Sequence, residues 1–80
     1  MQDQARPGRL RWRCRRGMKE LDVLLERFLE AECEPLAAGR WPELEVLLDA
    51  ADDVLWHWLQ NPAAVDAAPY RRLLEQIRHG

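Results

Sequence analysis

A helical repeat of apolar residues in the middle of the chain limits the folds that it can adopt. Between residues 18 and 34 the apolar side chains lie three and four positions apart: Leu21, Leu24, Leu25, Phe28 and Leu29. This spacing puts them on one face of an α-helix, which we expect to end before Pro35. Strands are disfavoured, because the 80 residues include one Ile and no Thr. A chain of this length can bury only one small core. The sequence therefore predicts an all-α fold, a compact single-domain bundle of about five short helices.

The N-terminal quarter contains a shorter repeat of the same kind. After Arg9 the apolar residues recur every four positions: Leu10, Cys14 and Met18. Gly17 can end this helix, because glycine readily adopts the left-handed conformation. Basic residues share the opposite side: Arg9, Arg13 and Arg16. Residues 1–8 are polar and end in Pro7-Gly8, so we expect a flexible N-terminal tail followed by a helical domain over 9–80.

Three more helices are expected in the second half. After a connector over 36–40, Trp41-Pro42 starts a helix with a buried stripe of Leu44, Leu47, Leu48 and Ala51. Asp52 or Asp53 caps a fourth helix, which ends at Asn61-Pro62 and buries Leu55, Trp58 and Leu59. Trp56 lies about 200° from Trp58 around this helix and is expected to be exposed. Asp66 caps a fifth helix, with Pro69 in its first turn and an apolar stripe of Tyr70, Leu73, Leu74 and Ile77.

Charge is distributed unevenly along the chain. Residues 1–20 carry seven basic and two acidic groups, a net charge of +5, whereas the other sixty residues carry −7. A basic N-terminal surface of this kind favours an anionic partner. The charge alone leaves open whether that partner is a nucleic acid, a membrane or an acidic protein surface.

Residues that carry catalysis or bind metal are scarce. The chain has no serine, its glycines stand alone, and Cys14 and Cys33 lack both metal-ligand spacing and a neighbouring histidine. We therefore expect neither an enzyme nor a metal site, and both cysteines are interpreted as small buried apolar residues. Apolar runs are too short to cross a bilayer, and the first residues lack the pattern of a secretory signal, which together predict a cytoplasmic location.

The stretch Arg9–Asp22 is the most informative part of the sequence. Part of it has a purely structural explanation, because Arg16 and Glu20 lie at a helix C-terminus and a helix N-terminus, where helix dipoles favour each charge. That explanation does not account for the many arginines around Trp12. Arginine and tryptophan are enriched at protein interfaces.

Within this stretch, the five residues Arg16-Gly17-Met18-Lys19-Glu20 resemble the RGxxE motif of the SdhE-type flavinylation factors of succinate dehydrogenase. The likeness extends to the flanking residues, which are Trp12, Cys14, Arg15, Leu21 and Asp22. A later segment is also similar to the family, at Leu47-Leu48, Asp52 and Leu55-Trp56-His57-Trp58-Leu59. Asp53-Val54 departs from the family pattern, and residues 61–80 carry no diagnostic motif.

The resemblance implies a small chaperone-like protein that binds the flavoprotein subunit of succinate dehydrogenase and promotes covalent attachment of FAD to it. The related flavoprotein of fumarate reductase is implied as a second client, and the FAD is taken to belong to the client rather than to this protein. By matching position, Arg16, Gly17 and Glu20 belong to the functional motif. Arg9, Trp12 and Met18 are implied to lie on the surrounding client-binding surface.

Two other functions compete with this interpretation. A nucleic-acid-binding module would place an arginine-rich helix over 9–16 on phosphates and stack Trp12 on a base. Glu20, Asp22 and the acidic remainder of the chain make it the less favoured alternative, and no nucleic-acid partner is expected. A membrane-surface helix would need a broader apolar face than Leu10, Cys14 and Met18 provide.

Overall fold

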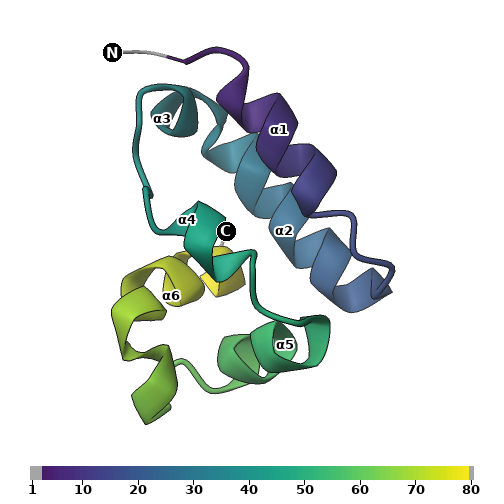
Figure 1. Ribbon diagram of the computed structural model, residues 1–80, viewed down its shortest axis with the longest axis vertical. Helices are drawn as coiled ribbons and strands as arrows, with labels where there is room; N and C mark the ends of the chain where they lie inside the picture. Colours follow the sequence, from purple (N-terminus) through teal and green to yellow (C-terminus); the bar gives the residue numbers. More distant parts are fainter. Residues whose placement is uncertain (1–2, 80) are drawn as a thin grey trace.

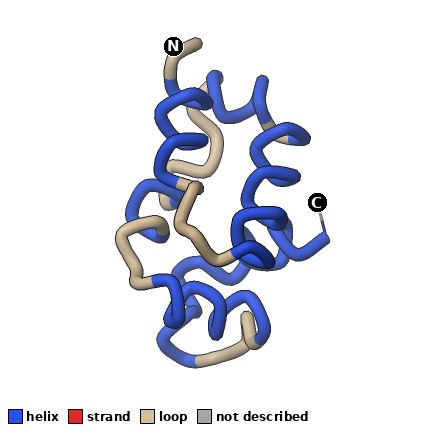
Figure 2. The backbone as a smooth tube through the Cα atoms, turned by 90° about the vertical axis from the view of Figure 1, so that its right-hand side faces the viewer, coloured by secondary structure: helices blue, strands red, loops and turns tan. Residues whose placement is uncertain are grey.

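A computed structural model describes residues 3–79, and all regular secondary structure in this range is helical, which confirms the all-α prediction (Figure 2). The elements in chain order are α1 (Arg6–Arg13), α2 (Lys19–Ala31), α3 (Cys33–Ala37), α4 (Leu44–Leu47), α5 (Asp52–Gln60), the 3-10 helix η1 (Val65–Tyr70) and α6 (Arg71–His79). In Figure 1, α1 lies alongside α2 and runs in the opposite direction, while α5 and α6 lie below them. Because α2 packs against α1, α3 and α6, it is the central helix of the bundle.

The core is built mainly from leucines contributed by every α-helix. The helix predicted from the apolar repeat supplies Leu21, Leu25, Phe28 and Leu29, all buried, whereas Leu24 is half-buried at the edge of the core. The predicted stripes also bury Leu10 and Cys14 from the N-terminal segment, and Leu73, Leu74 and Ile77 from α6. Periodicity therefore identified the inward faces of these helices correctly.

The first helix begins three residues earlier than its apolar repeat indicates. It starts at Arg6, with Pro7 in the first turn, where proline is tolerated because the first N–H groups of a helix have no intrahelical acceptor. The segment before it is attached to the fold, since the Asp3 N–H donates to the Ala37 carbonyl at 2.6 Å. Residues 6–8, assigned to the tail by sequence, thus belong to the helix, and residues 1 and 2 of that tail lie outside the described range.

The long helix expected over 18–34 is divided in two. Helix α2 ends at Ala31, and Pro35 lies inside the short helix α3 rather than after the helix. The reason is steric, because a proline ring clashes with the carbonyl four residues earlier in a continuous helix, which here is that of Ala31. The connector predicted over 36–40 instead spans 38–43, and its turn contains Gly39 at φ 99°.

The segment between α3 and α5 folds around Trp41, which the sequence did not place in the core. Trp41 has a positive φ of 58°, is buried, and meets Phe28 edge-on with 6.2 Å between ring centroids. Its indole N–H donates to Glu32 at 2.9 Å. Three predicted leucines of the following stripe are buried, but Ala51 is exposed because α4 is a single turn that ends at Leu47.

The aspartates expected to cap helices have other partners. The N-cap of α5 is Ala51, and the Asp52 carboxylate binds an arginine side chain instead of the helix N-terminus. Asp66 lies inside η1 without a capping bond and accepts a hydrogen bond from the Trp58 indole at 3.2 Å. Helix α5 does end before Asn61-Pro62, as predicted.

The prediction that Trp58 is core and Trp56 is exposed is wrong. Both side chains are half-buried and pack against the edge of the core. Trp58 stacks on Tyr70 with 5.7 Å between ring centroids, because η1 folds back over α5 and covers that face. Trp56 lies on the side of α5 that borders α2.

Candidate functional site

The corner between α1 and α2 contains Gly17, whose φ of 89° is the predicted left-handed conformation, but α1 ends at Arg13, so Gly17 lies in the connection and does not end the helix. The turn is held by Asp22 from the first turn of α2: one carboxylate oxygen accepts the Arg16 N–H at 2.9 Å and the other accepts the Gly17 N–H at 3.2 Å. A Cβ added at Gly17 would meet no atom within 4 Å. The corner is therefore fixed from inside by Asp22, and its outer side is open to a partner.

Asp22 was not selected as a site residue from the sequence. An acidic residue in the first turn of a helix, five positions after a glycine, was the available signal. That signal did not show which backbone N–H groups the carboxylate would accept, because this depends on the path of residues 14–18.

Arg16 points into the protein instead of toward a partner. Its side chain is 13% exposed, and its Nε donates to the Asp52 carboxylate at 2.5 Å. The two terminal nitrogens donate to the carbonyls of Leu48 at 2.8 Å and Ala50 at 2.5 Å. Arg16 thus joins the α1–α2 corner to the connection between α4 and α5, and all three of its guanidinium nitrogens are bonded within the chain.

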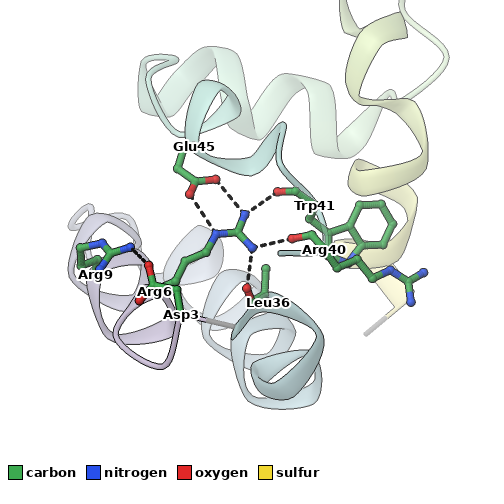
Figure 3. A network of polar contacts seen from close by, with 7 residues as sticks. All are labelled: Asp3, Arg6, Arg9, Leu36, Arg40, Trp41 and Glu45. Carbon is green, nitrogen blue, oxygen red and sulfur yellow. Dashed lines mark hydrogen bonds and ion pairs between the residues drawn. The ribbon is translucent and has the colours of Figure 1, made fainter. Parts of the chain in front are cut away.

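Arg6 makes an even larger network at the other end of α1 (Figure 3). Its guanidinium forms a bidentate pair with Glu45, with both distances 2.9 Å. The same group donates to three backbone carbonyls, those of Leu36 and Arg40 at 2.6 Å and that of Trp41 at 2.8 Å. This hydrogen bonding holds the pKa of Glu45 below its ordinary value and raises that of Arg6. Arg6 therefore fixes the irregular segment between α3 and α4 against α1.

The remaining two arginines on this side of α1 also have partners. Arg9 pairs with Asp3 and Arg13 pairs with Asp49, each at 2.5 Å, although Arg9 remains 60% exposed. The expectation of a basic N-terminal surface is therefore wrong for Arg9, Arg13 and Arg16, because each is paired with a carboxylate of the chain and Arg16 is largely buried. Arg9 belongs to the N-terminal half of α1, near Asp3, rather than to the corner.

Arg11 and Trp12 lie on other sides of α1, and Arg15 lies in the connection between α1 and α2. Trp12 is 75% exposed, and both arginines are exposed, with no ion pair or hydrogen bond from either side chain to another described residue. The two arginines border a hollow of about 420 Å³ that reaches Gly17, Asp22 and α2. This outer surface was only partly anticipated, since Trp12 was predicted and the two free arginines were not.

The other predicted residues of the corner have different environments. Met18 is half-buried and packs against the core, so it offers only part of its side chain to a partner. Glu20 is exposed in the first turn of α2, and its carboxylate has no partner in the described chain. The structure therefore brings Gly17, Met18 and Glu20 to one corner near Trp12.

The interpretation of both cysteines as small buried residues is correct for Cys14 but wrong for Cys33, which is exposed. Burial raises the pKa of Cys14 to about 12, so its thiol stays protonated and unreactive. No group of three or more His, Cys, Asp or Glu side chains within 3–79 could hold a metal ion. In the same range, no helix is both long and apolar enough to cross a membrane.

Comparison with known proteins identifies relatives of the whole domain. The family model described as "Flavinator of succinate dehydrogenase" matches residues 8–80. The "FAD assembly factor SdhE" of Coxiella burnetii (strain RSA 493 / Nine Mile phase I) is 36% identical over 70 residues, covering 88% of this chain and 85% of the relative. The protein of the same name from Legionella pneumophila (strain Paris) is 37% identical over 75 residues, covering 94% and 90%.

A third relative extends the match to nearly the full chain. The "FAD assembly factor SdhE" of Xylella fastidiosa (strain 9a5c) is 36% identical over 78 residues, which cover 98% of this chain and 80% of the relative. No solved structure matches the chain significantly. These matches confirm the resemblance predicted from the sequence, and the chain belongs to the family of flavinators of succinate dehydrogenase.

Proposed function

We propose that this protein binds the flavoprotein subunit of succinate dehydrogenase and promotes covalent attachment of FAD to that subunit. The proposal depends mainly on one observation, the family match over residues 8–80. It includes the flavoprotein of fumarate reductase as a second client of the same surface. The FAD belongs to the client, and the protein acts in the cytoplasm without a cofactor or an enzymatic step of its own.

The client-binding surface in this proposal is the outer side of the α1–α2 corner. It consists of Arg11, Trp12, Arg15, Gly17 and Glu20, which are all exposed. An exposed tryptophan beside arginines without internal partners is typical of interface anchors, because both side chains offer large contact areas and directional contacts. Glu20 adds an acidic group to a mainly basic surface, so it favours a client that presents both charges.

The proposed mechanism is conformational. A binding protein promotes a reaction in its client only if it binds the reactive conformation more tightly than the other conformations. Gly17 lets the backbone of the client approach closely, because nothing lies within 4 Å of the place where a side chain would begin. Arg16 acts indirectly here, since its bonds to Leu48, Ala50 and Asp52 hold the corner in position.

Replacing Glu20 tests whether its carboxylate contacts the client. Glu20→Gln is nearly isosteric, and as a change at a helix N-terminus it lowers the free energy of unfolding by only about 0.3–1 kcal/mol. If the carboxylate also meets the client, covalent FAD falls strongly, because the change leaves a charged group of the client poorly paired. The measurement is flavin fluorescence of the client subunit on denaturing gels, in cells with this variant as the only copy.

Glu30→Gln is the matched control, because Glu30 is exposed on the same helix, lies in its C-terminal half, away from the corner, and does not line the hollow beside Gly17. It should leave covalent FAD unchanged. Equal flavinylation by wild type and Glu20→Gln at equal expression would remove Glu20 from the client-binding surface.

The pairing of arginines within the chain argues against the alternative function of nucleic-acid binding. Four of the seven basic groups in residues 1–20 are engaged with carboxylates of the chain: Arg6, Arg9, Arg13 and Arg16. Phosphate binding would have to compete with these pairs. A pull-down from native lysate separates the two proposals, since it should retain an FAD-containing dicarboxylate oxidoreductase subunit rather than nucleic acid.

A further inference from the structure

A second hollow adjoins the corner on the side of α2 that faces α5. Its volume is about 490 Å³, and its lining residues are Lys19, Glu20, Val23, Leu24 and Trp56. Val23 is 45% exposed, while Leu24 and Trp56 are half-buried and pack against the core. The hollow therefore has an apolar floor that folding leaves partly open to solvent.

The rim of this hollow carries two opposite charges. Lys19 and Glu20 are both exposed, and neither side chain has an ion pair or hydrogen bond to any other described residue. Elsewhere in the chain, two arginines that reach the core are paired: Arg6 with Glu45, and Arg16 with Asp52. Protein interfaces commonly have an apolar core surrounded by a polar rim, and an apolar floor beside two unpaired charges matches that arrangement.

We propose that this hollow receives an apolar side chain of the client flavoprotein subunit, from a segment that places a basic group beside Glu20 and an acidic group beside Lys19. The inference rests on the proposed function and extends it, because it assigns Trp56 and Val23 to client recognition. Glu20 belongs both to the α1–α2 corner and to the rim of the hollow. One client segment that crosses Glu20 would therefore contact both surfaces.

A second copy of this chain fits the hollow less well than the client does. Lys19 and Glu20 are adjacent and opposite in charge, so two copies could pair them across a two-fold axis. Five lining residues are far fewer than the roughly 20–30 residues per partner that a stable interface uses. The client has the additional area of the corner, with Trp12 and the free arginines, and this continuity favours a client segment.

The test places a charge of either sign on the floor of the hollow. Val23→Glu and Val23→Lys should each weaken binding to the purified apo flavoprotein subunit of succinate dehydrogenase by about tenfold or more, because both charges oppose burial beneath an apolar side chain. Val46→Glu and Val46→Lys are matched controls, since Val46 is 56% exposed on α4 and lines neither this hollow nor the one beside Gly17. The controls should stay within about twofold of wild type.

Thermal unfolding of each variant, followed by circular dichroism, checks that the fold is kept, as expected for partly exposed valines on helix surfaces. If both Val23 variants bind the subunit as strongly as the Val46 variants do, the inference is overturned. The proposed function would still stand in that case, because the wild type binds the subunit. Loss of binding in only one of the two Val23 variants would show a charge effect and would also overturn it. Failure of the wild type to bind the subunit would overturn the proposed function itself.

Two further outcomes are decided by the same proteins. A concentration-dependent wild-type dimer in analytical ultracentrifugation that Val23→Glu dissociates would assign the hollow to a second copy and overturn the proposal. A monomeric wild type whose Val23 and Leu24 methyl NMR signals shift on addition of the flavoprotein subunit would support it.

Discussion

Helix α1 and the residues between it and Gly17 carry two sets of arginines, one paired within the chain and one unpaired. Arg6, Arg9 and Arg13 fall within about 60° around α1, and they and Arg16 each pair with a carboxylate of this chain. Arg11 and Arg15 lie on another side, and neither pairs with a described residue. The residue type is the same in both sets, so the role of each arginine depends on whether carboxylates and unpaired carbonyls lie opposite it.

Arg6 should show the largest effect of this difference on stability. Arg6→Met keeps an apolar stem but removes the donors to Glu45 and to three carbonyls, and it should lower the free energy of unfolding by about 3 kcal/mol. Arg9→Met, which removes an exposed pair, should cost at most about 0.5 kcal/mol. Urea unfolding measures both, and equal losses would show that the Arg6 network adds no stability beyond a surface pair.

Arg16 and Arg15 are neighbours in the chain, and substituting each in turn separates an effect on stability from an effect on client binding. Arg16→Lys should lower the free energy of unfolding by about 1–2 kcal/mol, because lysine cannot reproduce the three donors to Asp52, Leu48 and Ala50. Arg15→Lys should change it by less than about 0.5 kcal/mol but weaken client binding. Loss of binding by Arg16→Lys at unchanged stability would instead place Arg16 in direct contact with the client.

Gly17 and Gly39 offer a matched pair for separating fold from binding. Both have positive φ, 89° and 99°, and a Cβ at either position would meet no atom within 4 Å. Alanine at either position should therefore lower the free energy of unfolding by a similar amount, about 1 kcal/mol, through backbone strain alone. Only Gly17→Ala should also weaken client binding. Binding that falls equally in both variants would trace the effect to stability.

The smallest predicted effect is a pH dependence from the Arg6–Glu45 pair. The hydrogen bond from Arg6 holds the pKa of folded Glu45 below its ordinary value of 4.5, so the ionised form stabilises the fold above that pH. This contribution is lost as pH falls through the lowered pKa. The free-energy difference between wild type and Glu45→Gln should be constant above about pH 5 and shrink in more acidic solution. A difference independent of pH would contradict a stabilising ion pair.

Several features of the fold could be predicted because they follow from local rules. The buried leucines of α2, the left-handed Gly17 and the end of α5 before Asn61-Pro62 were all predicted correctly. Apolar periodicity fixes which face of a helix is buried, and proline and glycine limit the backbone regardless of distant contacts.

The incorrect predictions share one physical cause, which is competition between local and distant partners. Asp52 is of a residue type that commonly caps helices, but its carboxylate binds Arg16. Asp66 was also expected to cap a helix and instead accepts a hydrogen bond from the Trp58 indole. Trp58 was predicted to be in the core from its position on the helix. In the structure it is half-buried, and Tyr70 of η1 stacks on it. Side chains with several possible hydrogen-bond partners cannot be assigned until the fold shows which of them is near.

The amino-acid sequence by itself determined the helical fold, the family and the position of the α1–α2 corner. These depend on spacing and on a continuous motif, which are properties of neighbouring residues. Only the tertiary structure decided which charges remain available, because Arg6 and Arg16 meet carboxylates 39 and 36 positions away. It also decided that Glu20 borders an apolar hollow with Trp56, since α2 and α5 are far apart in the chain and line one surface only in the folded protein.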